Sequence, residues 1–235
     1  NIILMITDAT SSINLTTPFS VSATTGSTYV VGNMIGGDFY NNTSVTLGSN
    51  GSLINGVGTA TLFDTSSNIN SVGTNVSGMV ISSLYTDNPF PHSISGTAVN
   101  EEGTNLGLIT LGNSSAEMYL KGGERARNED KISVGNSSVG IYAKGNGAYI
   151  VNNNGLINVG EESTGLFLKD GNSISNMGIS EIKSTSKKSV GIYSENSVLG
   201  TALITNDNKI DLSGDQSIGI YTTGENNITN NGMIK

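Results

Sequence analysis

The pentapeptide Ser138-Val139-Gly140-Ile141-Tyr142 recurs along the second half of the chain with small changes. The other copies are Ser163-Thr164-Gly165-Leu166-Phe167, Ser189-Val190-Gly191-Ile192-Tyr193 and Ser217-Ile218-Gly219-Ile220-Tyr221. Their glycines are 25, 26 and 28 residues apart, and Ser115-Ala116-Glu117-Met118-Tyr119 is a degraded copy upstream. A period of this length is typical of solenoids, in which each repeat stacks on its neighbours.

A second phrase falls between these copies. It has the pattern apolar-x-Asn-x-Gly/Asn, in which x is any residue. It reads Val151-Asn152-Asn153-Asn154-Gly155, Ile174-Ser175-Asn176-Met177-Gly178, Ile204-Thr205-Asn206-Asp207-Asn208 and Ile228-Thr229-Asn230-Asn231-Gly232. Asparagine and glycine favour turns, and stacked amides can hydrogen-bond to one another. We therefore expect Asn153, Asn176, Asn206 and Asn230 to form a ladder at a turn.

Apolar and polar residues alternate within each copy of the first phrase, which indicates short β-strands. The alternation predicts an inward ladder of Val139, Thr164, Val190 and Ile218 beside a second one of Ile141, Leu166, Ile192 and Ile220. Together with the period, it predicts an all-β fold, a right-handed parallel β-helix of about nine coils of roughly 25 residues, with loop insertions. A β-propeller is the alternative fold, although its blades are usually longer and carry other motifs.

The composition supports this class of fold and excludes others. The 235 residues include 31 glycines and 30 asparagines, only 13% are charged, and cysteine is absent. Glycine and asparagine disfavour helices, so a helical bundle is excluded. Without cysteine there are no disulfides and no thiolate metal sites. The net charge of −8 argues against a nucleic-acid partner, which needs clustered Lys and Arg.

The repeat divides the chain into three parts. Residues 131–235 read as regular coils, and residues 76–130 as irregular coils with loop insertions. Residues 1–75 read as degenerate coils or as a small β appendage. Two insertions interrupt the period, a segment around 84–92 that contains two of the three prolines, and a charged segment over 121–131. Because proline cannot donate to a strand ladder, the first segment is expected to leave the rod as a loop.

The aromatic residues Tyr119, Tyr142, Phe167, Tyr193 and Tyr221 share one position of the repeat. Period 2 puts this position opposite the Val and Ile ladders, so we expect an external aromatic stripe, with room beside each ring at Gly140, Gly165, Gly191 and Gly219. Such a stripe could stack on sugars or on a partner. The alternative is packing between coils that stiffens the rod.

The sequence offers little catalytic chemistry. Its adjacent carboxylates are Glu101-Glu102, Glu129-Asp130 and Glu161-Glu162, all in polar contexts typical of solvated turns. The single histidine, His92, has no matched acid nearby in the sequence. We therefore expect no catalytic residues, no cofactor and no metal site.

The phrases over 138–145 and 228–234 resemble the repeats of type V autotransporter passengers, in particular the large fusobacterial outer-membrane adhesins. The resemblance is specific over 131–235, moderate over 76–130 and weak before that. It implies a parallel β-helix displayed on a bacterial cell surface, attached to the outer membrane through a C-terminal barrel that this chain does not contain. It also implies a host cell-surface glycan, a host protein receptor or other bacteria as the partner.

We therefore expect a segment of a non-enzymatic adhesin that binds through loops projecting from a rigid rod. The residues expected to make contacts are Tyr85, Asp87, Asn88, Phe90 and His92 in the first insertion, and Arg125 and Arg127 in the second. Two alternatives stay open: a β-helix enzyme that degrades polysaccharides, and a purely structural stalk spacer.

Overall fold

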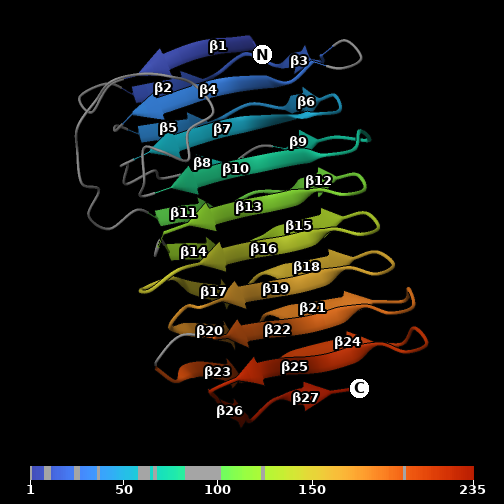
Figure 1. Cartoon of the computed structure of the whole chain (residues 1–235). Helices are drawn as coiled ribbons and strands as arrows, with labels where there is room; N and C mark the ends of the chain where they lie inside the picture. Colours follow the sequence, from blue (N-terminus) through green and yellow to red (C-terminus); the bar gives the residue numbers. More distant parts are fainter. Residues whose placement is uncertain are drawn as a thin grey trace.

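The chain winds into an elongated rod whose two termini lie at opposite ends (Figure 1). This computed structural model describes residues 2–7, 12–23, 27–35, 38–57, 64–65, 68–82, 102–122, 125–197 and 200–235. Within these residues the chain forms 27 β-strands and no helix. Consecutive strands belong to different walls, and strands three places apart along the chain pair in parallel, for example β13 with β16 and β16 with β19, except that β8 and β11 lie in separate sheets.

Two walls of the rod are sheets of nine strands each. Sheet A contains β1 (Ile2–Thr7), β4 (Tyr29–Ile35), β7 (Gly51–Val57), β10 (Val76–Ser82), β13 (Ala116–Lys121), β16 (Val139–Lys144), β19 (Thr164–Lys169), β22 (Val190–Asn196) and β25 (Ile218–Gly224). Sheet C contains β3 (Phe19–Val21), β6 (Val45–Leu47), β9 (Ile69–Asn70), β12 (Ile109–Leu111), β15 (Lys131–Val134), β18 (Leu156–Val159), β21 (Glu181–Ser184), β24 (Lys209–Leu212) and β27 (Met233–Ile234).

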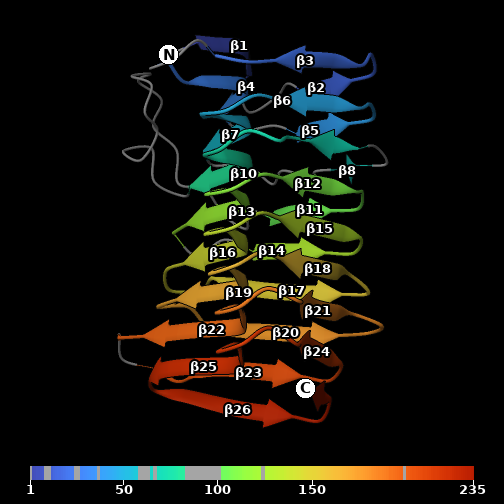
Figure 2. The same ribbon diagram turned by 90° about the vertical axis from the view of Figure 1, so that its right-hand side faces the viewer.

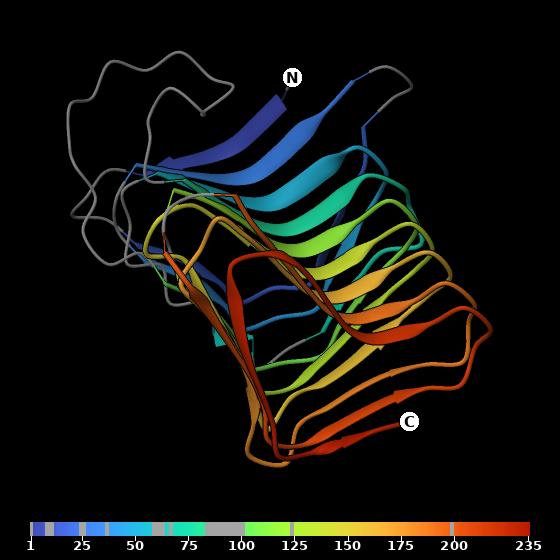
Figure 3. The same cartoon turned by 60° about the horizontal axis from the view of Figure 1, so that its bottom comes forward.

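The third wall consists of two shorter sheets, visible together with sheet C in Figure 2. Sheet B contains β2 (Ser12–Leu15), β5 (Asp38–Asn41) and β8 (Asp64–Thr65). Sheet D contains β11 (Glu102–Asn105), β14 (Arg125–Asn128), β17 (Tyr149–Asn153), β20 (Ser173–Met177), β23 (Ala202–Asn206) and β26 (Asn226–Asn230). One coil is thus a strand of sheet A, a strand of sheet B or D, and a strand of sheet C, and the tilted view in Figure 3 shows the coils in succession.

The predicted parallel β-helix with coils of about 25 residues is confirmed. Most strands of residues 1–75 lie in the same sheets as the later ones, because β1, β4 and β7 belong to sheet A and β3, β6 and β9 to sheet C, while β2, β5 and β8 form the separate sheet B. The early part of the chain is therefore built as coils of the rod.

The core is a set of columns in which similar apolar side chains stack from coil to coil. In sheet C the column consists of Ile69, Ile109, Ile132, Ile157, Ile182 and Ile210, all buried. Sheet A contributes Met79, Met118, Ile141, Leu166 and Ile192, and sheet D contributes Ala126, Ile150, Ile174 and Ile204. These side chains fill the interior because each packs directly on a side chain of similar shape in the neighbouring coil.

The predicted inward ladder of Val139, Thr164, Val190 and Ile218 is wrong. Val139 is only half-buried and faces out with Tyr142, while Gly140 is buried beside Ile141. A Cβ on Gly140 would lie 2.6 Å from the Gly165 carbonyl oxygen and 3.0 Å from a methyl of Ile157. In β16 this position approaches sheet C so closely that only glycine fits, and Gly140 and Ile141 are buried in succession, which shifts the alternation by one residue. Gly140 therefore faces the interior and does not provide the expected space beside the aromatic ring of Tyr142.

The serine of the repeat occupies the corner between sheets C and A. The backbone N–H of Ser115 donates to the Ser138 hydroxyl at 3.0 Å, and that of Ser138 donates to the Ser163 hydroxyl at 3.1 Å. The Ser163 hydroxyl in turn donates to the carbonyl of Gly135 at 2.9 Å. These bonds satisfy backbone groups at a buried turn, where the sheets cannot.

An asparagine ladder, buried except at its last member Asn230, runs along the turn between sheets D and C. Each side-chain amide donates to the amide oxygen of the next coil at 2.7–2.8 Å, through Asn105, Asn128, Asn152, Asn176, Asn206 and Asn230. The expected ladder is confirmed at three positions but Asn153 was one residue off, since it faces outward and donates to Glu129. Asn105 and Asn128 extend the ladder beyond the prediction.

Glu117 stands at the glycine position of the repeat, between the paired residues Ala116 and Met118 of β13. Its carboxyl lies against Gly78 of the preceding coil, where a Cβ would come within 2.9 Å of Oε2. The side chain is completely buried, and neither carboxyl oxygen has a hydrogen-bond partner in the described part of the chain. Burial raises the pKa of Glu117 to about 8, so the group is mostly protonated at neutral pH.

Replacing Asn152 by alanine should destabilise the rod by about 1–3 kcal/mol, because Asn128 loses its acceptor and Asn176 its donor in a buried site. The control is Asn153→Ala, one residue along, which removes only half-buried contacts and should cost about 1 kcal/mol or less. Urea unfolding followed by circular dichroism measures both. Equal losses would contradict the central role of the ladder.

Raising the pH should destabilise the chain through Glu117. The folded carboxyl has a pKa of about 8 and the unfolded one about 4.5, so between these values the folded state holds a proton that the unfolded state has lost. The contribution of Glu117 to stability is therefore fully present below pH 4.5 and falls by at most about 1.4 kcal/mol per pH unit up to about pH 8. Urea unfolding from pH 5 to 8 measures the slope, and Glu117→Gln should flatten it. An unchanged slope in the variant would refute the assignment.

Candidate functional site

The outer face of sheet C carries one unbroken column of hydrogen-bonding side chains, which we name the polar column. Its members, each in register with the next, are Ser20, Thr46, Asn70, Thr110, Ser133, Asn158, Lys183 and Asp211. They alternate along each strand with the buried isoleucine column, so they face outward. The column presents hydroxyls, amides and charges at the spacing of the coils, about 4.8 Å.

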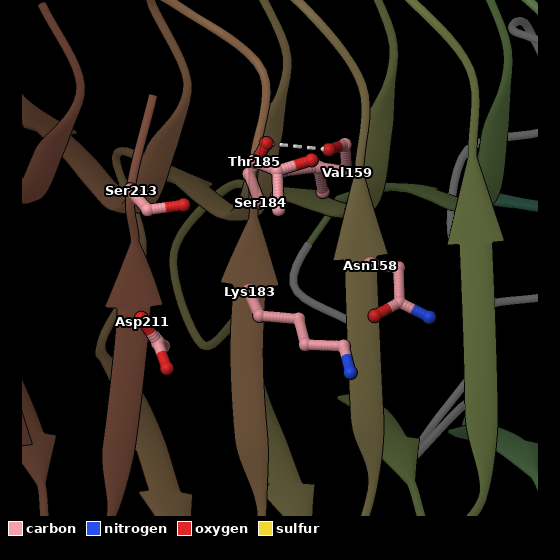
Figure 4. Close-up of a pocket in the computed structure, with 7 residues that line it drawn as sticks. All are labelled: Asn158, Val159, Lys183, Ser184, Thr185, Asp211 and Ser213. Carbon is pink, nitrogen blue, oxygen red and sulfur yellow. Dashed lines mark hydrogen bonds between the residues drawn. The ribbon is translucent and has the colours of Figure 1, made fainter. Parts of the chain in front are cut away.

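Two hollows lie along this face. One has a volume of about 450 Å³ and is lined by Asn158, Val159, Lys183, Ser184, Thr185, Asp211 and Ser213 (Figure 4). The other, of about 350 Å³, lies nearer the N-terminus and is lined by Ser44, Val45, Thr46, Asn68, Ile69, Asn70, Leu108 and Thr110. Both extend over several coils and are open to solvent, a shape that suits an extended ligand better than a small enclosed one.

The first hollow lies over strand ends that are held together by a hydrogen bond, and polar side chains line it. The Ser184 hydroxyl donates to the Val159 carbonyl at 2.7 Å, which holds the end of β21 against β18. Figure 4 shows the Lys183 side chain reaching toward Asn158 and away from Asp211. The Asn158 amide donates to Ser133 at 3.1 Å, and its buried oxygen has no hydrogen-bond partner among the described residues. The exposed side chains of Lys183 and Thr185 in the lining can donate to and accept from a ligand.

The charges around this hollow are partly paired. Lys209 contacts Glu181 at 2.7 Å and Asp211 at 2.8 Å. The hydrogen bond from Lys209 lowers the pKa of Asp211, and Lys235 adds to the effect at 3.4 Å. Lys183 makes no ion pair within the described residues. The ammonium group of Lys183 is therefore available to a ligand.

The aromatic stripe on the outer face of sheet A is confirmed, but its rings pack on one another. Tyr119 stacks on Tyr142 at 4.8 Å between centroids, and Phe167 on Tyr193 at 4.5 Å. Tyr142 and Phe167 meet edge to face at 5.1 Å. Because neighbouring rings occupy the ring faces, the stripe offers mainly edges and hydroxyls outward, which favours the alternative that it stiffens the rod. A hollow of about 400 Å³ lies beside Tyr119 and Tyr142.

The prediction of a loop over 121–131 is wrong, because Arg125–Asn128 forms strand β14. Four residues suffice for a strand here since Ala126 and Asn128 face the core in register with β17. Arg125 lies over the ring of Tyr149 at 5.0 Å, and Arg127 forms an ion pair with Glu129. Burial alone would raise the pKa of Glu129, but hydrogen bonds from Asn153 and Arg127 lower it below its ordinary value.

The other predicted contact residues, Tyr85, Asp87, Asn88, Phe90 and His92, lie outside the described residues. Their role as ligand contacts stays a prediction, as does that of the two exposed arginines. The polar column was missed because threonine, asparagine and serine are common throughout this sequence. The polar column could have been recognised only by aligning all repeats from residue 20 to residue 211 in the correct strand register.

The adjacent carboxylates that are described do not converge on a hollow. Glu161 pairs with Lys187 at 3.1 Å and Glu162 with Lys188 at 2.7 Å, both between neighbouring coils. Glu129 is held by Arg127 and two asparagines. In the described ranges, no group of three or more His, Asp or Glu side chains is placed to bind a metal ion. Within the same ranges, no helix is long and apolar enough to span a membrane.

Comparisons with known proteins leave the fold as the established result. No protein-family model matches the chain, and no curated protein and no solved structure is significantly similar to it. The parallel β-helix is shown by the strand pairing itself.

Replacing Tyr142 by alanine should destabilise the chain by about 2 kcal/mol, because it removes a stacked and an edge-to-face contact together with buried area. The control is Tyr149→Ala on sheet D, outside the stripe, where about 1 kcal/mol is expected from the loss of one cation–π contact and some packing. Urea unfolding compares the two. If both variants lose the same stability, the stripe does not stiffen the rod.

Proposed function

We propose that this chain is a segment of a surface-displayed bacterial adhesin, of the autotransporter passenger type, and that the outer face of sheet C binds a glycan chain. The partner would be a glycan of a host cell or of another bacterium. The chain would act as a non-enzymatic binding rod, exposed outside the outer membrane. The observation that carries the proposal is the polar column with its two hollows.

The chemistry of the polar column matches the chemistry of sugars. A sugar residue presents several hydroxyls that both donate and accept, and Thr46, Asn70, Thr110 and Asn158 offer the complementary groups. Groups repeated at each coil can bind successive sugar residues of a linear chain. Because the column is built on strands, its groups are held in place before binding, which lowers the entropic cost of association.

The rod itself supports display. Its strands stack in one direction with buried columns throughout, so its length can grow by adding coils without changing the core. The resemblance of residues 131–235 to passengers of surface adhesins agrees with such a role. The insertion at 85–92 and the exposed Arg125 and Arg127 are further proposed contacts for a receptor.

A glycan array probed with the chain, together with a pull-down of cell-surface proteins, tests the proposal. We expect binding to a set of extended glycans, weakened about fivefold to tenfold by Asn158→Ala through the loss of one polar contact in the hollow. The control is Ser175→Ala on the outer face of sheet D, which should bind like the original chain.

Three other results would contradict parts of the proposal. Absence of binding to every glycan and surface protein would refute the adhesin and favour a structural spacer. Cleavage of an arrayed polysaccharide would instead favour an enzyme. Binding that Asn158→Ala leaves unchanged would remove the site from sheet C.

A further inference from the structure

A second wall of the rod carries a stack of like charges. On the outer face of sheet A, Lys121 pairs in register with Lys144, and Lys144 with Lys169. Strands in neighbouring coils are about 4.8 Å apart, and like charges directly opposite one another destabilise a sheet. Since the whole chain has a net charge of −8, three lysines in consecutive coils are a marked local exception.

The acidic groups on this wall neutralise only one end of the stack. Glu195 follows Lys169 in register and contacts it at 2.7 Å. Asp170 accepts hydrogen bonds from the hydroxyl and the backbone N–H of Ser197, which lower its pKa, with smaller contributions from Lys169 and Lys144. Lys121 and Lys144 form no ion pair among the described residues. Within the described ranges, the positive charge without an acidic partner is therefore at β13 and β16.

Two tyrosines lie beside these two lysines on the same outward face. Tyr119 and Tyr142 precede Lys121 and Lys144 by two residues, and their rings stack with an interplanar angle of 16°. The Lys121 ammonium lies 5.1 Å from the centre of the Tyr119 ring. The wall is hollowed on the far side of the rings, where Ser77, Ser114 and Ser137 contribute to the lining. We name these four residues, Tyr119, Lys121, Tyr142 and Lys144, the lysine–tyrosine strip.

We propose that the lysine–tyrosine strip binds an acidic glycan, that is, a sugar chain bearing carboxylate or sulfate groups. The two ammonium groups would pair with acid groups on the chain, and the ring edges and phenol hydroxyls would contact the sugar. This site lies on a different wall from the polar column and stands independently of the function proposed for that column.

The ring geometry favours a sugar over a nucleic acid. Single-stranded nucleic acids bind by stacking bases on free aromatic faces. Here the faces of Tyr119 and Tyr142 cover each other, and Tyr142 also meets the Phe167 ring. The strip is also one column wide, which fits a linear chain lying on the rod.

Binding of chondroitin sulfate, with neutral dextran of equal length and oligothymidylate as comparisons, tests the proposal. We expect binding to chondroitin sulfate that weakens as NaCl is raised, and an affinity about tenfold lower in the double variant Lys121→Gln, Lys144→Gln. The control is Lys187→Gln, Lys188→Gln, which changes the net charge equally at ion pairs on the turn. It should retain most of the affinity.

A stability measurement separates binding from a structural role. If the lysines serve binding, the double variant should unfold at the same or a slightly higher temperature, because repulsion between them is removed. Equal affinity of the double variant and the original chain would overturn the proposal, as would no binding, equal binding to dextran, or stronger binding to oligothymidylate. None of these results bears on Asn158→Ala, so the two proposals can fail separately.

Discussion

The rod depends on stacking the same group over itself at the spacing of parallel strands. The clearest example of this stacking is the asparagine ladder, in which each buried amide donates to one neighbour and accepts from the other. A buried amide costs free energy unless its hydrogen bonds are made. The ladder therefore holds the coils in one register, since a shift of a single residue would leave several amides unsatisfied.

The same rule explains which residues fit and which stand out. Isoleucines, serines and glycines each form columns because the neighbour above and below has the same shape. Glu117 departs from this rule, with a neutral carboxyl filling space above Gly78. The paired lysines Lys121 and Lys144 depart from it on the outer face, because stacking there places two positive charges side by side and they repel each other. Departures that oppose stability are where a rod of this kind can carry function.

Sequence periodicity predicted the class of fold well, because two phrases recurred in step and each had a strand pattern. It placed Ile141, the aromatic stripe and three ladder asparagines on the correct sides. It failed at Val139 and Gly140, since strict alternation takes no account of two consecutive buried residues, and at Gly140 Ile157 of another wall leaves no space for a side chain. The expected loop at 121–131 failed for a related reason: a strand of four residues is too short to show a period but is held by its neighbours in the stack.

Repetition along the chain thus determined, without any structure, that this protein is a stack of short strands with asparagine at one turn and aromatic rings outside. Those features are local, because they follow from which residues recur at a fixed interval. The tertiary structure alone decided which side chains meet across coils, and so which surfaces exist. The polar column and the lysine–tyrosine strip each join residues from coils that are 20 or more positions apart in the sequence, and only the register between strands brings them together.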